Sequence, residues 1–113
     1  EMQRACNFLL EKQNEDGGWG ESFKSCVEME WVPHPDGSQV VNTAWAIIAL
    51  QMARHPNSEA IKRGVEYLCS RQLNTGDWEQ EGISGVFNAN CAISYSGYKN
   101  IFPIWALAMF NSH

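Results

Sequence analysis

The stretch RACNFLLEKQNEDGGW at residues 4–19 recurs 59 positions later as RGVEYLCSRQLNTGDW at residues 63–78. The two copies share an arginine, a small residue, an aromatic residue and a leucine, followed by a glutamine, a glycine and a tryptophan. The last three positions are Gln13, Gly17 and Trp19 in the first copy and Gln72, Gly76 and Trp78 in the second. An internal repeat of this kind indicates two copies of one supersecondary unit.

The first part of each copy has the pattern of an amphipathic helix. Apolar or small residues recur at i, i+3, i+4, i+7 and i+8, which places them on one helical face. They are Met2, Ala5, Cys6, Leu9 and Leu10 in the first copy, and Ile61, Gly64, Val65, Leu68 and Cys69 in the second. Asn57 or Ser58 can cap the second helix, and turn residues at 14–18 and 74–76 end the two helices.

An apolar segment follows each copy, at residues 44–50 and 104–110. Both segments are apolar on every face, which predicts helices that are buried on all sides. Asn42 or Thr43 is expected to cap the first of these helices, and Pro103 suits the first turn of the second.

The predicted order is therefore outer helix, Gly-Trp loop and inner helix, twice over, in repeat units of about 1–58 and 59–113. Stacked hairpins of this kind predict an all-α fold, namely a fragment of an α/α solenoid or toroid built from two helical hairpins. Two hairpins cannot close a ring. We therefore expect the chain to be part of a longer protein, with inner helices that expose an apolar face.

The composition is that of a folded domain. The chain has 113 residues, 44% of them apolar and 19% charged, which excludes a disordered tail. A net charge of −5 without a basic cluster argues against nucleic acid as a partner. No stretch offers the roughly 20 apolar residues that a membrane span requires. Aromatic residues make up 12% of the chain and include five tryptophans, of which Trp31 falls in no motif.

Reactive groups are few and scattered. The four cysteines lie far apart without a Cys-x-x-Cys pair, which favours free thiols in a reducing compartment, with two disulfides in a secreted protein as the alternative. No side chains stand at metal-ligand spacing, so neither a metal nor a cofactor is expected. The three histidines, beside prolines or at the terminus, are expected at the surface. Asp77, Glu79 and Glu81 form either a solvated loop or paired carboxylates for acid–base chemistry.

The repeated Gln-Trp pairs allow two interpretations. A glutamine amide and an indole N–H can tie a helix end to its neighbour, and recurrence at the repeat period favours this structural role. The alternative is a platform for stacking sugars, in which Trp19 and Trp78 would be exposed side by side.

The stretch GISGVFNANCAISYSGY at residues 82–98 carries no charge. If it is helical beyond Val86, then Phe87, Cys91, Tyr95 and Tyr98 share one face. Such a face is either a core stripe or the wall of an apolar pocket with phenol groups at its edge. The glycines in the stretch make a loop equally possible.

Both copies of the repeat match the QW motif of the triterpene cyclases, and residues 85–107 resemble the C-terminal end of the oxidosqualene cyclases. The resemblance covers essentially the whole chain. It implies that residues 1–113 are the C-terminal part of the catalytic α/α toroid domain of an isomerase. Enzymes of this family convert (S)-2,3-oxidosqualene to a tetracyclic sterol precursor by acid-initiated cationic cyclisation and rearrangement.

The resemblance also implies roles for single residues. Phe87 would stabilise a late cation, Cys91, Tyr95 and Tyr98 would shape the same pocket wall, and Asn88 would support it. Aromatic π-faces suit this task because they attract a cation without capturing it. Residues 91–95 favour lanosterol as the product, whereas residues 41–46 also resemble cycloartenol-forming enzymes, so that cycloartenol or another triterpene is the alternative.

One departure from the family pattern limits what this chain can do. The family's initiating acid lies in an Asp-Cys-Thr-Ala-Glu string that does not occur here. We therefore expect no catalytic acid in this chain and no cyclase activity from the chain alone. The expected partners are oxidosqualene, the rest of the same polypeptide and, through segments outside this chain, the endoplasmic reticulum membrane or a lipid droplet. An aromatic carbohydrate-binding module and a purely structural α/α repeat are the non-enzyme alternatives.

Overall fold

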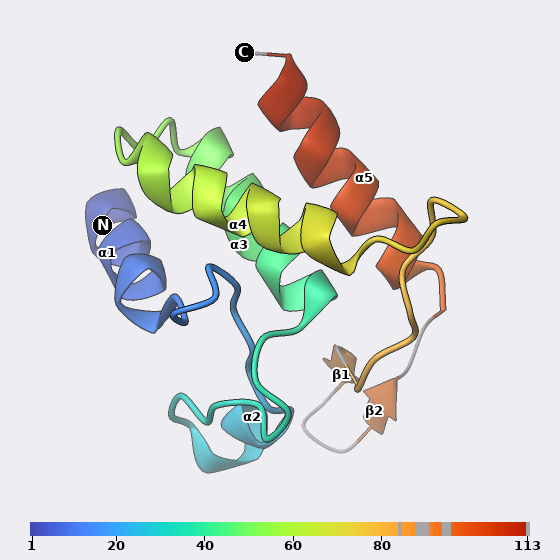
Figure 1. Cartoon of the computed structure of the whole chain (residues 1–113). Coiled ribbons are helices and arrows are strands. Elements are labelled where there is room, and N and C mark those ends of the chain that lie inside the picture. The colour runs from blue at the N-terminus through green and yellow to red at the C-terminus, as the bar shows by residue number, and fades with distance from the viewer. Residues whose placement is uncertain (84, 88–90, 94–95, 113) are drawn as a thin grey trace.

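The chain is built around three long helices and a shorter first helix (Figure 1). The computed structural model describes residues 1–83, 85–87, 91–93 and 96–112, with 85–87 and 91–93 described by their backbone. The elements in chain order are α1 (Met2–Lys12), α2 (Lys24–Glu28), α3 (Val40–Met52), α4 (Ser58–Arg71), β1 (Gly85–Phe87), β2 (Cys91–Ile93) and α5 (Tyr98–Asn111). The predicted all-α class is confirmed, with a two-stranded hairpin as a small addition.

Helix α3 lies at the centre and packs against α1, α4 and α5. Its sequence is apolar on nearly every face, and Ala44, Ile47 and Leu50 have no exposed surface at all. The prediction that 44–50 is a buried helix is confirmed except at Trp45, which is half-buried, and Ala49, which is exposed. The core therefore forms where α4 and α5, which also contact each other, both pack on α3.

The two outer helices bury different amounts of their apolar faces. On α4, Ile61, Val65 and Leu68 all enter the core. On α1, Cys6 is the one buried residue, and Leu9 and Leu10 are half-buried. The amphipathic pattern is the same in both helices. The difference arises because α4 packs against both α3 and α5, whereas α1 packs against α3.

Helix α5 differs from its prediction in two ways. It begins at Tyr98, so Pro103 lies inside the helix rather than in its first turn. Segment 104–110 is not buried on all sides either, because Ile104 is 56% and Trp105 is 47% exposed. The physical reason is that α5 packs on α3 and α4 with the side that carries Pro103 and Ala106. Phe102, Leu107 and Met109 are partly buried against the same core, whereas Ile101, Ile104 and Trp105 are exposed.

The helix starts provide a second comparison with the prediction. The side chain of Asn57 accepts a hydrogen bond from the Ala60 N–H at 3.0 Å, which confirms the predicted cap of α4. The predicted cap of α3 is wrong, because that helix begins at Val40 and holds Asn42 and Thr43 inside it. Among the described residues, no helix is long and apolar enough to span a membrane.

Two segments of the uncharged stretch, residues 85–87 and 91–93, form the paired strands of a hairpin rather than a helix. Strands β1 and β2 pair antiparallel, and the register places Gly85 opposite Ile93 and Phe87 opposite Cys91. The helical interpretation is therefore wrong for residues 85–87 and 91–93. Valine, phenylalanine and isoleucine favour extended backbone, and the glycine at the start disfavours a helix.

Candidate functional site

The first Gln-Trp pair joins three helices. The Gln13 side-chain amide donates to the Gly17 carbonyl within its own loop and to the Ala60 carbonyl of α4, both at 2.9 Å. The Trp19 indole N–H donates to the Leu9 carbonyl of α1 at 2.7 Å, and its backbone N–H donates to the Thr43 hydroxyl of α3 at 2.9 Å. The loop is thereby attached to α1, α3 and α4.

The second pair repeats the bonds within the loop. The Gln72 amide donates to the Gly76 carbonyl at 2.8 Å, and the Trp78 indole N–H donates to the Leu68 carbonyl at 3.0 Å. Trp19 and Trp78 are each only 1% exposed. Neither indole offers a face to a ligand, so the sugar-stacking alternative is wrong for these two residues.

Three of the residues predicted to line the substrate pocket, Phe87, Cys91 and Tyr98, lie in the described part of the chain. The backbones of Phe87 and Cys91 are directly opposite each other across β1 and β2. Asn88 and Tyr95 lie outside the described residues. Tyr98 is half-buried at the start of α5.

Tyr98 belongs to an aromatic cluster between α3 and α5. Its ring meets Trp45 and Phe102 edge to face, with centroids 5.9 and 5.3 Å away, and Trp45 meets Phe102 at 5.3 Å. Trp105 stacks on Phe102 at 6.2 Å and is 47% exposed. We name these four residues the α3–α5 aromatic cluster. They join Tyr98, a predicted pocket residue, to aromatic side chains of both inner helices.

Two hollows lie beside Trp45. One, of about 330 Å³, is lined by Trp45, Ile83, Asn42 and residues of the α2 region. The other, of about 260 Å³, is lined mainly by apolar side chains that include Trp19, Trp31 and Trp45. Trp31, which the sequence left without a role, also meets Phe8 edge to face at 5.7 Å. Concave apolar surface is thus present next to the inner helix α3, as a pocket wall requires.

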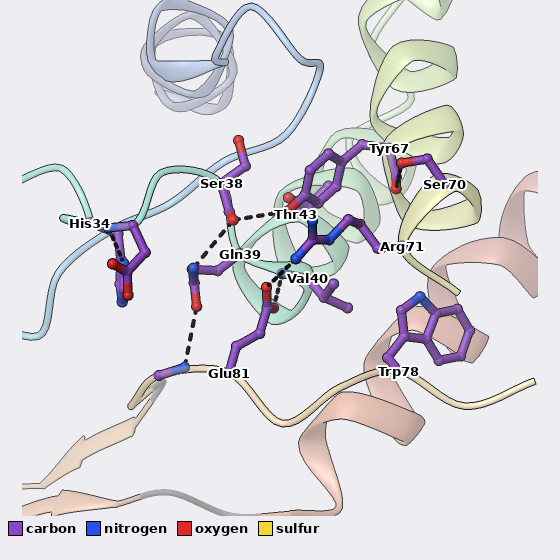
Figure 2. Close-up of polar contacts among 12 residues, drawn as sticks. His34, Ser38, Gln39, Val40, Thr43, Tyr67, Ser70, Arg71, Trp78 and Glu81 are labelled. Carbon is purple, nitrogen blue, oxygen red and sulfur yellow. Dashed lines mark hydrogen bonds and ion pairs between the residues drawn. The ribbon is translucent and has the colours of Figure 1, made fainter. Parts of the chain in front are cut away.

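Sequence reasoning did not predict the role of Glu81, which caps α3 from a position 41 residues away in the sequence. Figure 2 shows its carboxylate directed at Val40 and Arg71. One oxygen accepts from the Val40 N–H at 2.6 Å, and the other lies 3.7 Å from the Arg71 guanidinium. Burial raises the pKa of Glu81 above its usual range, opposed by the Val40 N–H and the Arg71 charge.

Glu81 belongs to a wider polar network. The Tyr67 hydroxyl donates to the Ser38 carbonyl at 2.8 Å, and the Gln39 amide donates to the same carbonyl at 3.2 Å (Figure 2). Burial, and then the charge of Glu81, raise the pKa of Tyr67 to about 12. The phenol is therefore neutral at physiological pH and serves as a hydrogen-bond donor.

Asp77 and Glu81, two of the three carboxylates at 77–81, contact different partners and do not form a paired acid–base site. The Lys99 ammonium contacts the Asp77 carboxylate at 2.9 Å, and this hydrogen bond lowers the pKa of Asp77. Glu81 faces Val40 and Arg71 instead. The solvated-loop interpretation is thus wrong for Glu81, and both carboxylates have structural contacts.

The described cysteines Cys6, Cys26 and Cys69 are free thiols. No group of three or more His, Cys, Asp or Glu side chains gathers within the described part of the chain in a way that could hold a metal ion.

Comparison with known proteins identifies the family. The sequence model described as the squalene-hopene cyclase C-terminal domain matches residues 1–112. The chain belongs to this family. Human lanosterol synthase is 55% identical over 111 residues, and lanosterol synthase from Pneumocystis carinii is 54% identical over 109 residues. Cycloartenol synthase from Dictyostelium discoideum is 58% identical over 92 residues.

These matches cover 98%, 96% and 81% of the chain. They cover only 15%, 15% and 13% of the three relatives, so the chain spans about a seventh of their length. Their enzyme names support the assignment of the chain to the oxidosqualene cyclases as a segment of their C-terminal domain. The repeated Gln-Trp loops, the hairpin and the α3–α5 aromatic cluster are therefore features of a cyclase domain.

Proposed function

We propose that this chain is the part of an oxidosqualene cyclase that forms one wall of the substrate cavity. The observation that carries the proposal is 55% identity to human lanosterol synthase over 98% of the chain. The proposed substrate is (S)-2,3-oxidosqualene, and the proposed reaction is a cationic cyclisation and rearrangement. Residues 1–113 would form part of a larger α/α toroid, with repeat units of about 1–58 and 59–113.

The wall consists of the hairpin and the start of α5. Phe87 is proposed to stabilise a late cation, with Asn88, Cys91, Tyr95 and Tyr98 shaping the surface around it. The contacts of Tyr98 with Trp45 and Phe102 support this assignment, because they fix its ring between the two inner helices. Aromatic faces stabilise a carbocation by about 0.5–2 kcal/mol each and do not trap it, as a carboxylate would.

The exposed apolar side of α5 agrees with a role inside a larger domain. Ile104 and Trp105 are about half exposed in this chain and would be covered or would face the cavity in the whole protein. The Gln-Trp loops would hold the helices that carry the wall, through the bonds of Gln13, Trp19, Gln72 and Trp78. The whole protein is proposed to lie at the endoplasmic reticulum membrane or a lipid droplet, where its apolar substrate would dissolve.

Lanosterol is the favoured product. Human and Pneumocystis lanosterol synthases match nearly the whole chain, which supports this choice. Cycloartenol is the alternative, because a cycloartenol synthase is 58% identical over 92 residues. The two products differ in the proton that is lost at the end, so one product analysis distinguishes them.

The test is a chimera of human lanosterol synthase in which the matching 111-residue segment is replaced by this chain. Incubation of the purified chimera with (S)-2,3-oxidosqualene should give lanosterol as the main product in gas chromatography with mass spectrometry. The chain alone should give no cyclised product, because the initiating acid would come from the rest of the enzyme.

A matched variant tests the wall itself. Phe87→Ala in the chimera should raise the share of products other than lanosterol, whereas Phe8→Ala, at an exposed position on α1, should not. A folded chimera that turns over no oxidosqualene would refute the proposed function.

A further inference from the structure

Residues 81 and 82 form a strap that joins both repeat units just before the hairpin. The strap consists of Glu81 and Gly82, and β1 begins at Gly85. Glu81 contacts the first residue of α3 and the last residue of α4, Val40 and Arg71. Two helices, α3 and α4, therefore meet the chain at the point where it leaves the second Gln-Trp loop (Figure 2).

The contact with α3 is the strongest of these. The Val40 N–H is one of the backbone donors at the helix start that have no acceptor within the helix. The side chain of the N-cap residue, Gln39, makes no hydrogen bond to it. The Glu81 carboxylate meets this donor at 2.6 Å, with only 16% of its side chain exposed. A carboxylate at this end of a helix gains from both a charge-assisted hydrogen bond and the helix dipole.

The second residue of the strap is held by the same helix start. The Gly82 N–H donates to the Gln39 side-chain oxygen at 3.3 Å. A Cβ atom at Gly82 would lie 2.8 Å from the His34 Nε2 atom, so the backbone approaches this imidazole closely. The Gln39 side-chain amide donates to the Ser38 carbonyl, and the same carbonyl accepts a hydrogen bond from the Tyr67 hydroxyl of α4. The strap thus has a fixed position relative to α3 and α4.

We propose that Glu81 is a positioning residue for cyclisation: its bond to the Val40 N–H fixes the base of the hairpin and so sets where the backbone of Phe87 and Cys91 stands against the substrate. This role rests on the proposed function. Loss of the bond lets the hairpin base shift, and the cation-stabilising wall then no longer matches the late cations. The expected result is a change in which product forms, and not only a lower rate.

The experiment uses the chimera with human lanosterol synthase and measures the ratio of other cyclised products to the main product. In Glu81→Ala this ratio should rise about tenfold, the size expected from loss of one buried charge-assisted hydrogen bond. In Glu81→Gln the amide oxygen still accepts from Val40 N–H, so the ratio should stay within about twofold of the unmodified chimera. Glu79→Ala, which removes an exposed carboxylate two positions away, is the matched control and should leave the ratio unchanged.

Val40→Pro tests the other side of the bond. Proline is favoured at the first position of a helix and lacks the N–H, and the extended backbone of Gln39, with φ −121° and ψ 141°, suits a residue that precedes proline. This variant should shift the product ratio as Glu81→Ala does, and the double variant should shift it no further.

Three results would overturn the role of Glu81. They are a Glu81→Ala enzyme that is slower but has an unchanged product ratio, a Glu81→Gln enzyme shifted as far as the alanine variant, and a Val40→Pro enzyme with the unmodified ratio. If Glu81→Ala does not accumulate as folded enzyme, Val40→Pro and Glu81→Gln decide the question. Failure of the proposed function itself has a different signature, since the unmodified chimera would then make no cyclised product.

Discussion

The two Gln-Trp loops have the same internal geometry but different surroundings. In both, the glycine has a positive φ, +90° at Gly17 and +88° at Gly76, and the glutamine amide donates to the carbonyl of that glycine. In the first loop, a Cβ at Gly17 would lie 2.5 Å from the Arg63 carbonyl oxygen of α4. At Gly76 the nearest atom to such a Cβ is the loop's own Gln72 amide, at 4.0 Å.

The comparison separates two functions of the motif. Closing the loop and burying the indole need only the repeat itself, and both copies achieve this. Joining one repeat to the next needs a neighbouring helix, which the first copy has in α4. There Gln13 bonds to the Ala60 carbonyl, and the Arg63 guanidinium donates to the Glu15 carbonyl at 2.8 Å. In the described part of the chain, the Gln72 side chain bonds only within its own loop.

The largest predicted difference is between alanine substitutions of the two glycines. Gly17→Ala should lower the free energy of unfolding by about 3 kcal/mol or more, because a strained positive φ is combined with a collision against α4. Gly76→Ala should cost about 1 kcal/mol from strain alone. Urea unfolding of the chain, followed by circular dichroism, measures both values, and equal losses would show that α4 does not cover Gly17 as described.

The two tryptophans should behave alike, since each is 1% exposed and donates one indole hydrogen bond. Trp19→Phe and Trp78→Phe should each cost about 2 kcal/mol, from the unsatisfied leucine carbonyl and the reduced packing. The same urea titrations provide the test. A clearly smaller loss at Trp78 would mean that the second loop is not closed in solution.

The two glutamines should differ by about 1.5 kcal/mol. Gln13→Ala removes two hydrogen bonds, one of them to α4, and should cost about 2 kcal/mol. Gln72→Ala removes one exposed bond and should cost about 0.5 kcal/mol. Thermal unfolding of the paired variants gives the difference, and the reverse order would contradict the assignment of Gln13 as the link between repeats.

The smallest effect concerns Asp77, which stands where the first loop has Gly18. Its hydrogen bond from Lys99 lowers the pKa of Asp77 below the ordinary value of 3.8. The resulting stability is therefore present above this ordinary value and is lost as the pH falls through the folded-state pKa. Asp77→Asn should be slightly less stable than the unmodified chain near neutral pH, and the gap should close in acid. The Trp78 N–H also donates to Asp77, at 2.7 Å, so the gap should shrink in a Lys99→Met background, and a gap of undiminished size would contradict this cause.

The helices could be predicted from the sequence because their signals are local. The spacing of Ile61, Val65 and Leu68 fixes a helical face, and Asn57 caps a donor only three residues away. The same local reasoning placed the start of α3 wrongly. Asn42 and Thr43 have cap-forming side chains, but the observed cap comes from Glu81, whose distance in the sequence hides the contact.

An exposed apolar face on the inner helices could be expected, but the hairpin and the side of α5 that is exposed could not be predicted, for related reasons. A four-residue spacing between Phe87 and Cys91 fits a helical face and also fits opposite positions in a hairpin, so periodicity alone cannot decide between them. The apolar composition of 104–110 indicates burial without saying against what. In this chain α3 and α4 cover one side of α5, and Trp105 remains half exposed.

The claim that the hairpin and the start of α5 form a cavity wall is tested most directly by a structure of the chimera with lanosterol bound. The account predicts that ring carbons of Phe87 and Tyr98 lie within about 4.5 Å of the sterol skeleton, the range of apolar contact. A bound sterol with both rings directed away from it, toward the outer face of the domain, would contradict the account.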